Sequence, residues 1–438
     1  MTGCAKALFF LLGAATLWAQ PDLSLTLTGH TGVSAAVPDF RGPAAAQPLM
    51  AAFNQTLWDD LDESGLLELK AKSLYPKTIP QQPQELRPAE WAMPPVAANY
   101  IVMGYTAIVD GQLALYGWLV DLRQPVAAGT VLAAHYGATL DEPGARRDAH
   151  EFAADIIRKF GGMPVLGTKI YFTSDRSGQQ NVWMMDPDGS NQQQVTRLAG
   201  KGGGPAAMTP AVSPDGHLLA FTSYAEFFPK IFLFSLNPPQ RMNFHLPGDD
   251  LNTTPSFTPD GRQMVFSWRR QIYIADLDGS HTRRVSSGTQ DTEVEPKVNP
   301  KTGSELAFVS DRGGHARVYR MNLDGNDVMS LSGAAGEANN PAWNPNGRTL
   351  AYACTQGYAT GGYHICLMDV ATQQVTELPN SGAREENPAW ALDGVHLVYM
   401  SAVGRGKPQI WTMLADGSHR RQLTTAGANK SPVWSAGP

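Results

Sequence analysis

Several residue sets in this sequence are of types that could do chemistry, but their spacing fits structural roles better. Ten histidines are scattered without a common spacing, so they do not predict a histidine-ligated metal site. The Asp-x-Asp-Gly runs at Asp186 and Asp276 resemble the start of a calcium loop but lack the other ligands, and we interpret them as turns. The sequence contains no His-Glu-x-x-His, Gly-x-Ser-x-Gly or phosphate-loop motif. We therefore expect no catalytic centre, no metal and no cofactor.

One short motif occurs twice, as Ser174-Asp175-Arg176 and Ser310-Asp311-Arg312. A catalytic Ser and Asp pair would need a histidine base, which the repeat does not supply. The motif fits a strand end better, where the Asp accepts backbone hydrogen bonds and the Arg projects from the surface. Arg176 and Arg312 are therefore kept only as candidate contacts for a partner.

Two cysteines, Cys354 and Cys366, are expected on consecutive antiparallel strands that flank an eleven-residue loop. In an exported protein, facing positions on a hairpin favour a disulfide. The alternative is a pair of reduced core cysteines.

The chain begins with the features of a secretory signal peptide. Lys6 is followed by an apolar run of twelve residues, 7–18, and by the small residue Ala19. The run is shorter than the roughly 20 residues of a membrane-spanning helix. We expect residues 1–19 to be removed and the product to be soluble and exported; the alternative is an uncleaved membrane anchor.

The overall composition excludes some classes of protein. The formal charge of −6 (34 basic against 40 acidic residues) argues against nucleic-acid binding, which needs a basic surplus. With 42% hydrophobic residues the chain is globular, and 43 Gly and 32 Pro indicate many turns between short strands.

A proline-led element repeats through the second half of the chain. The leading prolines are 45, 41, 45, 47 and 44 residues apart, at Pro210, Pro255, Pro296, Pro341, Pro388 and Pro432. A period in the forties with four short strands per unit is typical of a β-propeller. The chain enters at the second strand of one blade, so the segment 431–435 must supply the missing first strand. We predict a six-bladed propeller over 167–438, closed by its C-terminal strand.

Residues 20–165 differ in pattern and predict a small α/β domain. Helical spacing occurs over 48–63 and 146–160, and the strand-like runs are 100–109, 113–121 and 130–136.

The loops directly before the repeat prolines are rich in Asn, Thr and Glu. Because each innermost strand is expected to start at the mouth of the central channel, these side chains would form a polar ring there. A binding face for a partner is the interpretation that we favour over simply solvated loops. Its candidate residues are Asn252, Thr254, Glu293, Glu295, Asn339, Asn340, Glu386, Asn387 and Lys430.

Motifs along nearly the whole chain after residue 19 resemble one family. They include Val37-Pro-Asp-Phe, Asn99-Tyr-Ile-Val-Met-Gly-Tyr, Ala149-His-Glu-Phe-Ala-Ala-Asp-Ile-Ile and Gly167-Thr-Lys-Ile-Tyr-Phe-Thr-Ser-Asp-Arg. With the signal peptide, the small domain and the six repeats in this order, the chain resembles the TolB family of the bacterial Tol-Pal system.

The resemblance implies a non-enzymatic periplasmic scaffold that supports outer-membrane integrity and constriction during cell division. It implies binding of a Pal-like outer-membrane lipoprotein at the propeller mouth, and of a TolA-like inner-membrane protein through residues 20–28. The candidate residues in that segment are Asp22, Leu23, Leu25 and Leu27. The protein would meet membranes only through these partners. The alternative function is an exported hydrolase or lyase of the propeller type.

Overall fold

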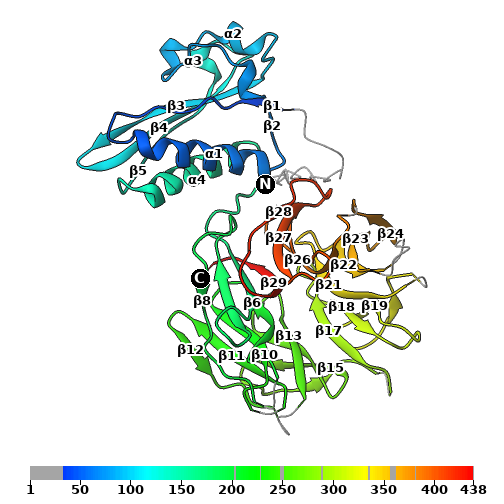
Figure 1. Ribbon diagram of the computed structural model, residues 1–438. Helices are drawn as coiled ribbons and strands as arrows, with labels where there is room; N and C mark the ends of the chain where they lie inside the picture. Colours follow the sequence, from blue (N-terminus) through cyan, green and yellow to red (C-terminus); the bar gives the residue numbers. More distant parts are fainter. Residues whose placement is uncertain are drawn as a thin grey trace, which may run out of the picture.

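The computed structural model describes residues 33–201, 204–226, 228–246, 251–287, 290–333, 336–355, 362–379 and 381–437. The expected signal peptide, 1–19, and the segment with Asp22, Leu23, Leu25 and Leu27 lie outside the described residues. Figure 1 shows two units, with the N-terminal domain above a ring of sheets.

The N-terminal domain is built on a five-stranded sheet with the strand order β2-β1-β3-β4-β5. β1 is parallel to both of its neighbours, whereas β3, β4 and β5 form an antiparallel meander. The bounds are β1 Ser34–Ala36, β2 Glu68–Leu69, β3 Tyr100–Val109, β4 Gln112–Asp121 and β5 Thr130–Ala138. The three predicted strands are therefore present, and two short strands were missed.

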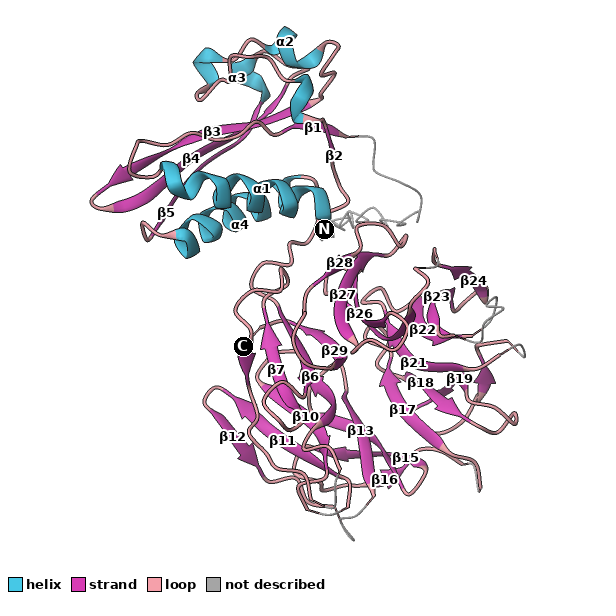
Figure 2. Ribbon diagram, in the orientation of Figure 1, coloured by secondary structure: helices cyan, strands magenta, loops and turns pink. Residues whose placement is uncertain are grey.

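Two long helices cover one face of this sheet, and shorter helices cover part of the other (Figure 2). Phe53 and Leu57 from α1 pack with Phe152 from α4 against Val102 and Leu115 of the sheet. The bounds are α1 Met50–Glu63, α2 Pro88–Ala92, α3 Val126–Gly129 and α4 Glu142–Lys159, with 3-10 turns at Gln47–Leu49, Lys72–Leu74 and Pro83–Glu85. No helix within the described ranges combines the length and apolar character that a membrane span requires.

Helix α4 begins four residues earlier than its apolar periodicity predicts. Asp141 is its N-cap, and its carboxylate accepts a hydrogen bond from the Gly144 N–H at 2.8 Å. The cap and Pro143 form a polar first turn, which the apolar spacing did not reveal.

The second unit is a six-bladed propeller, as predicted. Each blade within the described residues is a four-stranded antiparallel sheet, and five of them are continuous in sequence. Their strands are β9 Met208–Val212, β10 Leu218–Ser223, β11 Lys230–Leu236, β12 Pro239–Met242; β13 Asn252–Phe257, β14 Gln263–Trp268, β15 Gln271–Asp276, β16 Arg283–Arg284; β17 Glu293–Val298, β18 Glu305–Ser310, β19 Arg317–Asn322, β20 Met329–Ser330; β21 Ala338–Trp343, β22 Thr349–Cys354, β23 His364–Asp369, β24 Gln374–Glu377; and β25 Arg384–Trp390, β26 His396–Ala402, β27 Gln409–Leu414, β28 Arg421–Gln422.

The sixth blade joins the two ends of the propeller segment. Its order is β29-β6-β7-β8, so the C-terminal strand pairs with the first strand of the unit (Figure 1). The bounds are β6 Lys169–Ser174, β7 Asn181–Met185, β8 Gln193–Gln194 and β29 Asn429–Ser435. In this pairing Val433 lies opposite Tyr171 and Trp434 opposite Ile170. The predicted closure of the ring by the C-terminal strand is therefore present.

The innermost strands begin earlier than the repeat suggested. The sequence pattern predicts each repeat proline at the first residue of its strand, but Pro255, for example, is the fourth residue of β13. The register shifts between Thr253 and Ser256, and the same irregularity recurs in β17, β21, β25 and β29. A bulge frees the proline from donating to the ladder, so the proline is tolerated inside the strand.

Two tryptophans connect neighbouring blades through hydrogen bonds. The Trp343 indole N–H donates to the Lys297 carbonyl at 2.9 Å, and the Trp390 indole N–H to the Ala342 carbonyl at 3.1 Å. Both rings are nearly buried between consecutive innermost strands. Burying a large aromatic side chain with its polar atom paired stabilises the ring of blades.

Candidate interaction surface at the propeller mouth

All six innermost strands line one central channel, a cavity of about 280 Å³. The residue directly before each repeat proline faces this cavity and has a left-handed backbone, with φ between 46° and 56°. We call these six residues the bulge ring: Thr209, Thr254, Glu295, Asn340, Asn387 and Ser431. Positive φ is uncommon for residues other than glycine, so the recurrence in every blade is a built feature of the bulges.

Side chains of the bulge ring bond to the backbone of the next blade. The Glu295 carboxylate accepts from the Asn340 N–H at 2.7 Å and from the Asn340 side-chain amide at 2.9 Å. The Asn340 side-chain oxygen accepts from the Asn387 N–H at 3.3 Å, and the Thr254 hydroxyl from the Glu295 N–H at 3.2 Å. The polar types at these positions are thus explained by backbone donors that the bulges release from the ladder.

Two side chains of opposite charge lie together in the channel. Burial raises the pKa of the Glu295 carboxyl, although hydrogen bonds from Asn340 oppose this, and burial lowers the pKa of Lys297. Both line the cavity two residues apart on β17. The channel therefore holds a close acid and base pair in a partly desolvated place.

The start of the innermost strands marks the mouth, at the end of the ring away from the N-terminal domain. Strand β25 runs from Arg384 to Trp390, and the turn after it leads to His396, the first residue of β26, which contacts Glu63 of α1. Because the turn end of β25 faces the N-terminal domain, its start lies at the opposite opening.

Three of the predicted residues stand at the rim of this opening. Lys430 is exposed, whereas Asn339 and Glu386 are partly buried. The Asn339 amide donates to the Tyr363 hydroxyl at 2.9 Å, and Glu386 pairs with Arg384 at 2.8 Å. They occupy the equivalent position in three blades, one residue outward from the bulge ring.

Other predicted residues make contacts inside the blades. Asn252 and Glu293 are buried, at 1% and 0% exposure. The Asn252 side chain accepts from the Ile231 N–H at 2.6 Å, and the Glu293 carboxylate pairs with Arg312. Arg176 donates to the Asn429 side chain at 3.0 Å and stacks over Trp183. These side chains are occupied within the blades rather than spread over the mouth.

Thr209 was not predicted, and Ser431 was placed in the loop before the last repeat proline but was not among the candidate residues. Both precede a repeat proline and complete the bulge ring, so the position before the proline was the signal that could have found them. Thr254, Glu295, Asn340 and Asn387 were predicted and do lie together in the channel.

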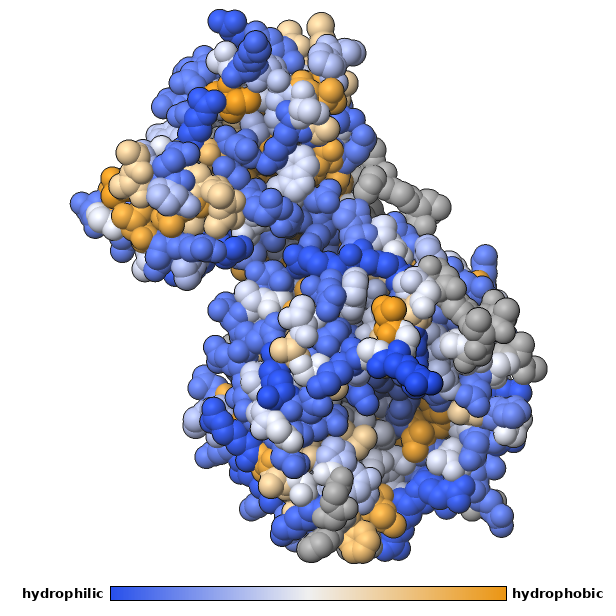
Figure 3. Space-filling view, viewed as in Figure 1, coloured by the Kyte–Doolittle hydropathy of each residue, from blue (hydrophilic) through white to orange (hydrophobic). Residues whose placement is uncertain are grey.

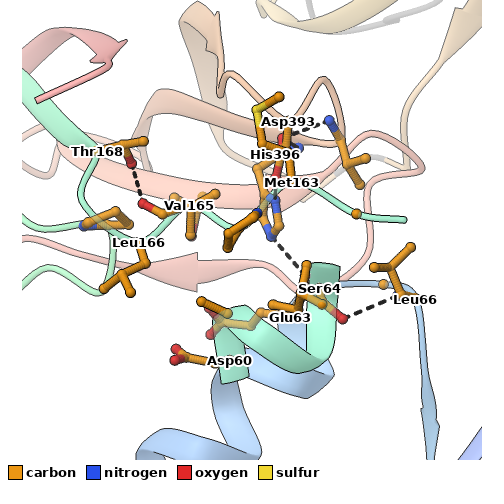
Figure 4. A pocket seen from close by; sticks show the side chains of 18 of the residues that line it. Asp60, Glu63, Ser64, Leu66, Met163, Val165, Leu166, Thr168, Asp393 and His396 are labelled. Atoms are coloured by element: carbon orange, nitrogen blue, oxygen red, sulfur yellow. Dashed lines mark hydrogen bonds and ion pairs between the residues drawn. The ribbon is translucent and has the colours of Figure 1, made fainter. Parts of the chain in front are cut away.

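A second, larger cavity of about 960 Å³ lies between the two units (Figure 4). Glu63 and Ser64 at the end of α1 approach it from one side, and Asp393 and His396 from the propeller side. The linker residues Met163 and Leu166 add exposed apolar surface, at 59% and 40%. Elsewhere the face seen in Figure 3 is mostly hydrophilic, with hydrophobic areas scattered over it.

Acidic and basic groups meet across this cavity. Burial raises the pKa of Glu63 to about 7, although Arg421 and His396 oppose the shift. Burial disfavours the His396 cation, but its charge interaction and hydrogen bond with Asp393 outweigh burial and raise its pKa. Burial also lowers the pKa of His150, but the hydrogen bond and the charge of Asp60 outweigh burial and raise this pKa above its usual value.

The fold and the channel define a class of protein: a six-bladed propeller behind a small α/β domain. The sequence matches the family described as TolB beta propeller domain over residues 161–437. The chain belongs to this TolB family.

Relatives and solved structures agree with this assignment. The Tol-Pal system protein TolB of Bordetella pertussis is 26% identical over 442 residues, with 98% of this chain and 94% of that protein covered. A TolB homolog of Chlorobium luteolum is 30% identical over 229 residues, which is half of each chain. TolB from Acinetobacter baumannii superposes with a TM-score of 0.74 at 20% identity, covering 92% of this chain and 96% of that one. The last comparison shows that the two proteins share the whole fold.

Proposed function

We propose that this protein is a non-catalytic periplasmic scaffold of the Tol-Pal system, which binds a Pal-like outer-membrane lipoprotein at the propeller mouth. The relatives named Tol-Pal system protein TolB support the system, and their match covers nearly the whole chain. The bulge ring carries the proposal for the mouth, because it brings polar side chains from all six blades to one opening.

The chemistry of the mouth favours a polar protein segment as the occupant. The rim presents an amide at Asn339, a carboxylate at Glu386 and an ammonium at Lys430. Such mixed donors and acceptors suit hydrogen bonding to a loop or a helix end, and rim charges act mainly on the rate and specificity of association. The channel beneath adds Glu295 and Lys297, which could receive one inserted side chain.

Charge-reversal variants at the two ends of the ring test the mouth. Lys430→Glu changes an exposed rim residue, and Lys301→Glu makes the same change on an exposed turn at the end that faces the N-terminal domain. The binding partner in the assay is the soluble domain of a Pal-like lipoprotein. We expect the double variant Lys430→Glu with Glu386→Lys to bind it about tenfold more weakly, or weaker still, than the wild type. The control variant Lys301→Glu should bind it as the wild type does. Equal binding by all three proteins would contradict the mouth as the site.

We also propose that residues 20–28 bind a TolA-like inner-membrane protein. The support is the TolB resemblance and the alternating Leu23, Leu25 and Leu27, a pattern suited to adding a strand to a partner's sheet. Removing residues 20–28 should abolish capture of the TolA-like domain while leaving the Pal-like domain bound. Retained capture of the TolA-like domain would refute this second site without touching the first.

A further inference from the structure

Cys354, His364 and Cys366 lie together inside the blade formed by β21 to β24. His364 is paired with Cys354 across β22 and β23, and Cys366 is two residues further along the same strand, so all three side chains share one face. Their exposures are 2%, 1% and 0%. A disulfide joins the two cysteines, with their Cα atoms 6.1 Å apart.

One ring nitrogen of His364 sits against both sulfurs. Its Nε2 lies 3.3 Å from the Cys354 Sγ and 3.4 Å from the Cys366 Sγ. With the ligand distances of zinc, about 2.3 Å to sulfur and about 2.0 Å to nitrogen, such ligand atoms lie about 3.5 Å apart at a tetrahedral angle and about 3.7 Å apart at the wider angle of a three-coordinate ion. The nitrogen is therefore already placed for ligation, and only the two sulfurs would have to part.

The surroundings favour the ligand forms of these residues. The Nε2 of His364 faces both sulfurs, and in the neutral imidazole this nitrogen can offer its lone pair to a metal ion. Trp343, Tyr352 and Met368 pack in the same hydrophobic cluster, which excludes water from the three side chains. Among the described residues, no further His, Cys, Asp or Glu joins this group.

A dry set of two thiolates and one imidazole selects a particular kind of ion. Structural zinc almost always takes four ligands, and here the protein brings three together. Soft thiolates select Cu(I), which accepts a lower coordination number. We propose that Cys354, His364 and Cys366 form a buried three-coordinate Cu(I) site once a dithiol reductant has opened the disulfide.

The chemistry balances in two steps. The dithiol transfers two electrons and two protons to the Cys354–Cys366 bond, giving two thiols and an oxidised, cyclic disulfide of the reductant. Cu(I) then displaces the two thiol protons to solution and takes Nε2 of His364 as its third ligand, with no change in the oxidation state of the ion.

The test is a Cu(I) titration of the whole chain from residue 20 onward, carried out without oxygen. The protein is first reduced with dithiothreitol, which is then removed. Against bicinchoninate as competitor, we expect the reduced protein to bind one equivalent and the oxidised protein none. Cys354→Ser should lose this binding, whereas His217→Asn, at an exposed histidine on a turn, should keep it. Equal Cu(I) uptake by the oxidised or the Cys354→Ser protein would overturn the proposal.

A second measurement starts from the wild-type protein, so its main result does not depend on the folding of any variant. X-ray absorption of the reduced wild-type protein with one Cu(I) should require two sulfur neighbours and one nitrogen neighbour. In His364→Asn the nitrogen contribution should disappear, with an affinity at least tenfold lower. A wild-type spectrum with sulfur neighbours alone would exclude the three-coordinate site.

Discussion

The Nε2 of His396, in the fifth repeat of the propeller, lies 2.7 Å from the backbone carbonyl oxygen of Glu63, the last residue of α1. The other ring nitrogen lies 2.5 Å from the Asp393 carboxylate. Both neighbours are acceptors, so the doubly protonated ring satisfies them together. Arg421 also reaches Glu63, at 2.9 Å. The contact between the two units thus centres on a charged histidine and an acidic helix end.

Raising the pH should weaken this contact. His396 has a raised pKa in the folded protein, so its stabilisation is complete below its unfolded pKa near 6.5 and is lost as the pH rises through the folded pKa. Glu63 changes the stability in the same direction. Its pKa is raised to about 7 in the folded protein, so the folded protein binds this proton more tightly than the unfolded chain and loses stability as the pH rises toward 7. Scanning calorimetry at about pH 6 and about pH 9 should show the lower melting temperature at the higher pH.

The variant His396→Gln isolates the histidine contribution. A glutamine amide cannot serve Asp393 and the Glu63 carbonyl with a charged donor, so we expect a loss on the order of 1–2 kcal/mol at about pH 6 and a smaller loss at about pH 9. His217→Gln, at an exposed histidine, should leave both melting temperatures unchanged. An equal loss for His396→Gln at both pH values would mean that the ring is not charged in the folded protein.

Asp148 on α4 predicts a separate pH effect. Its side chain is fully buried, and neither carboxylate oxygen has a hydrogen-bond partner in the described part of the chain. Burial raises its pKa to about 7. Asp148→Asn should therefore stabilise the protein by about 3 kcal/mol near pH 8, where the folded wild-type group must ionise, and change little near pH 4, which is close to the unfolded pKa of the carboxyl. Urea unfolding at the two pH values measures this, and a variant that is destabilised near pH 8 would contradict it.

Closure of the ring predicts a strong effect of a short deletion. Removing 430–438 takes away most of β29, including Trp434, whose indole N–H donates to the Thr168 hydroxyl at 2.8 Å. Loss of such a buried aromatic alone costs about 3–5 kcal/mol. We expect the melting temperature to fall by about 10 °C or more. Removing only 436–438, which lie beyond β29, is the control, and an equal effect of both deletions would argue against closure through β29.

The bulge ring predicts a difference between two changes at one residue. Glu295→Ala leaves the Asn340 N–H without its acceptor, so we expect a loss of about 1–3 kcal/mol. Glu295→Gln keeps an amide oxygen for the same bond and should cost less. Thermal unfolding of the pair compares them directly. If Ala and Gln were equally tolerated, the bond to Asn340 would contribute nothing to the ring.

Much of the fold was readable from the sequence because the repeat has a fixed period. The six leading prolines gave the number of blades, and the missing first strand gave the closure at β29. The bulges were not readable, because a left-handed Thr254 or Glu295 goes against the usual preference of these residues and follows from the paired strands. The strand starts were therefore placed two to four residues too late.

The functional residues divided along the same lines. In a regular strand, residues two apart share one face, so Asn252 would lie on the same side as Thr254. The bulge breaks this alternation. Thr254 and Glu295 therefore face the channel, whereas Asn252 and Glu293 are buried. Contacts between distant segments were beyond reach: Glu63 and His396 are 333 residues apart. The same holds for His364, whose place between two cysteines depends on the strand register.

Site-specific photo-crosslinking tests the mouth as the partner site most directly. A photoreactive amino acid replaces Asn339 at the rim in one protein and Lys301 at the opposite end of the ring in another. With the soluble domain of a Pal-like lipoprotein, we expect a crosslinked complex from position 339 and none from position 301. Crosslinking from position 301 without crosslinking from position 339 would contradict it.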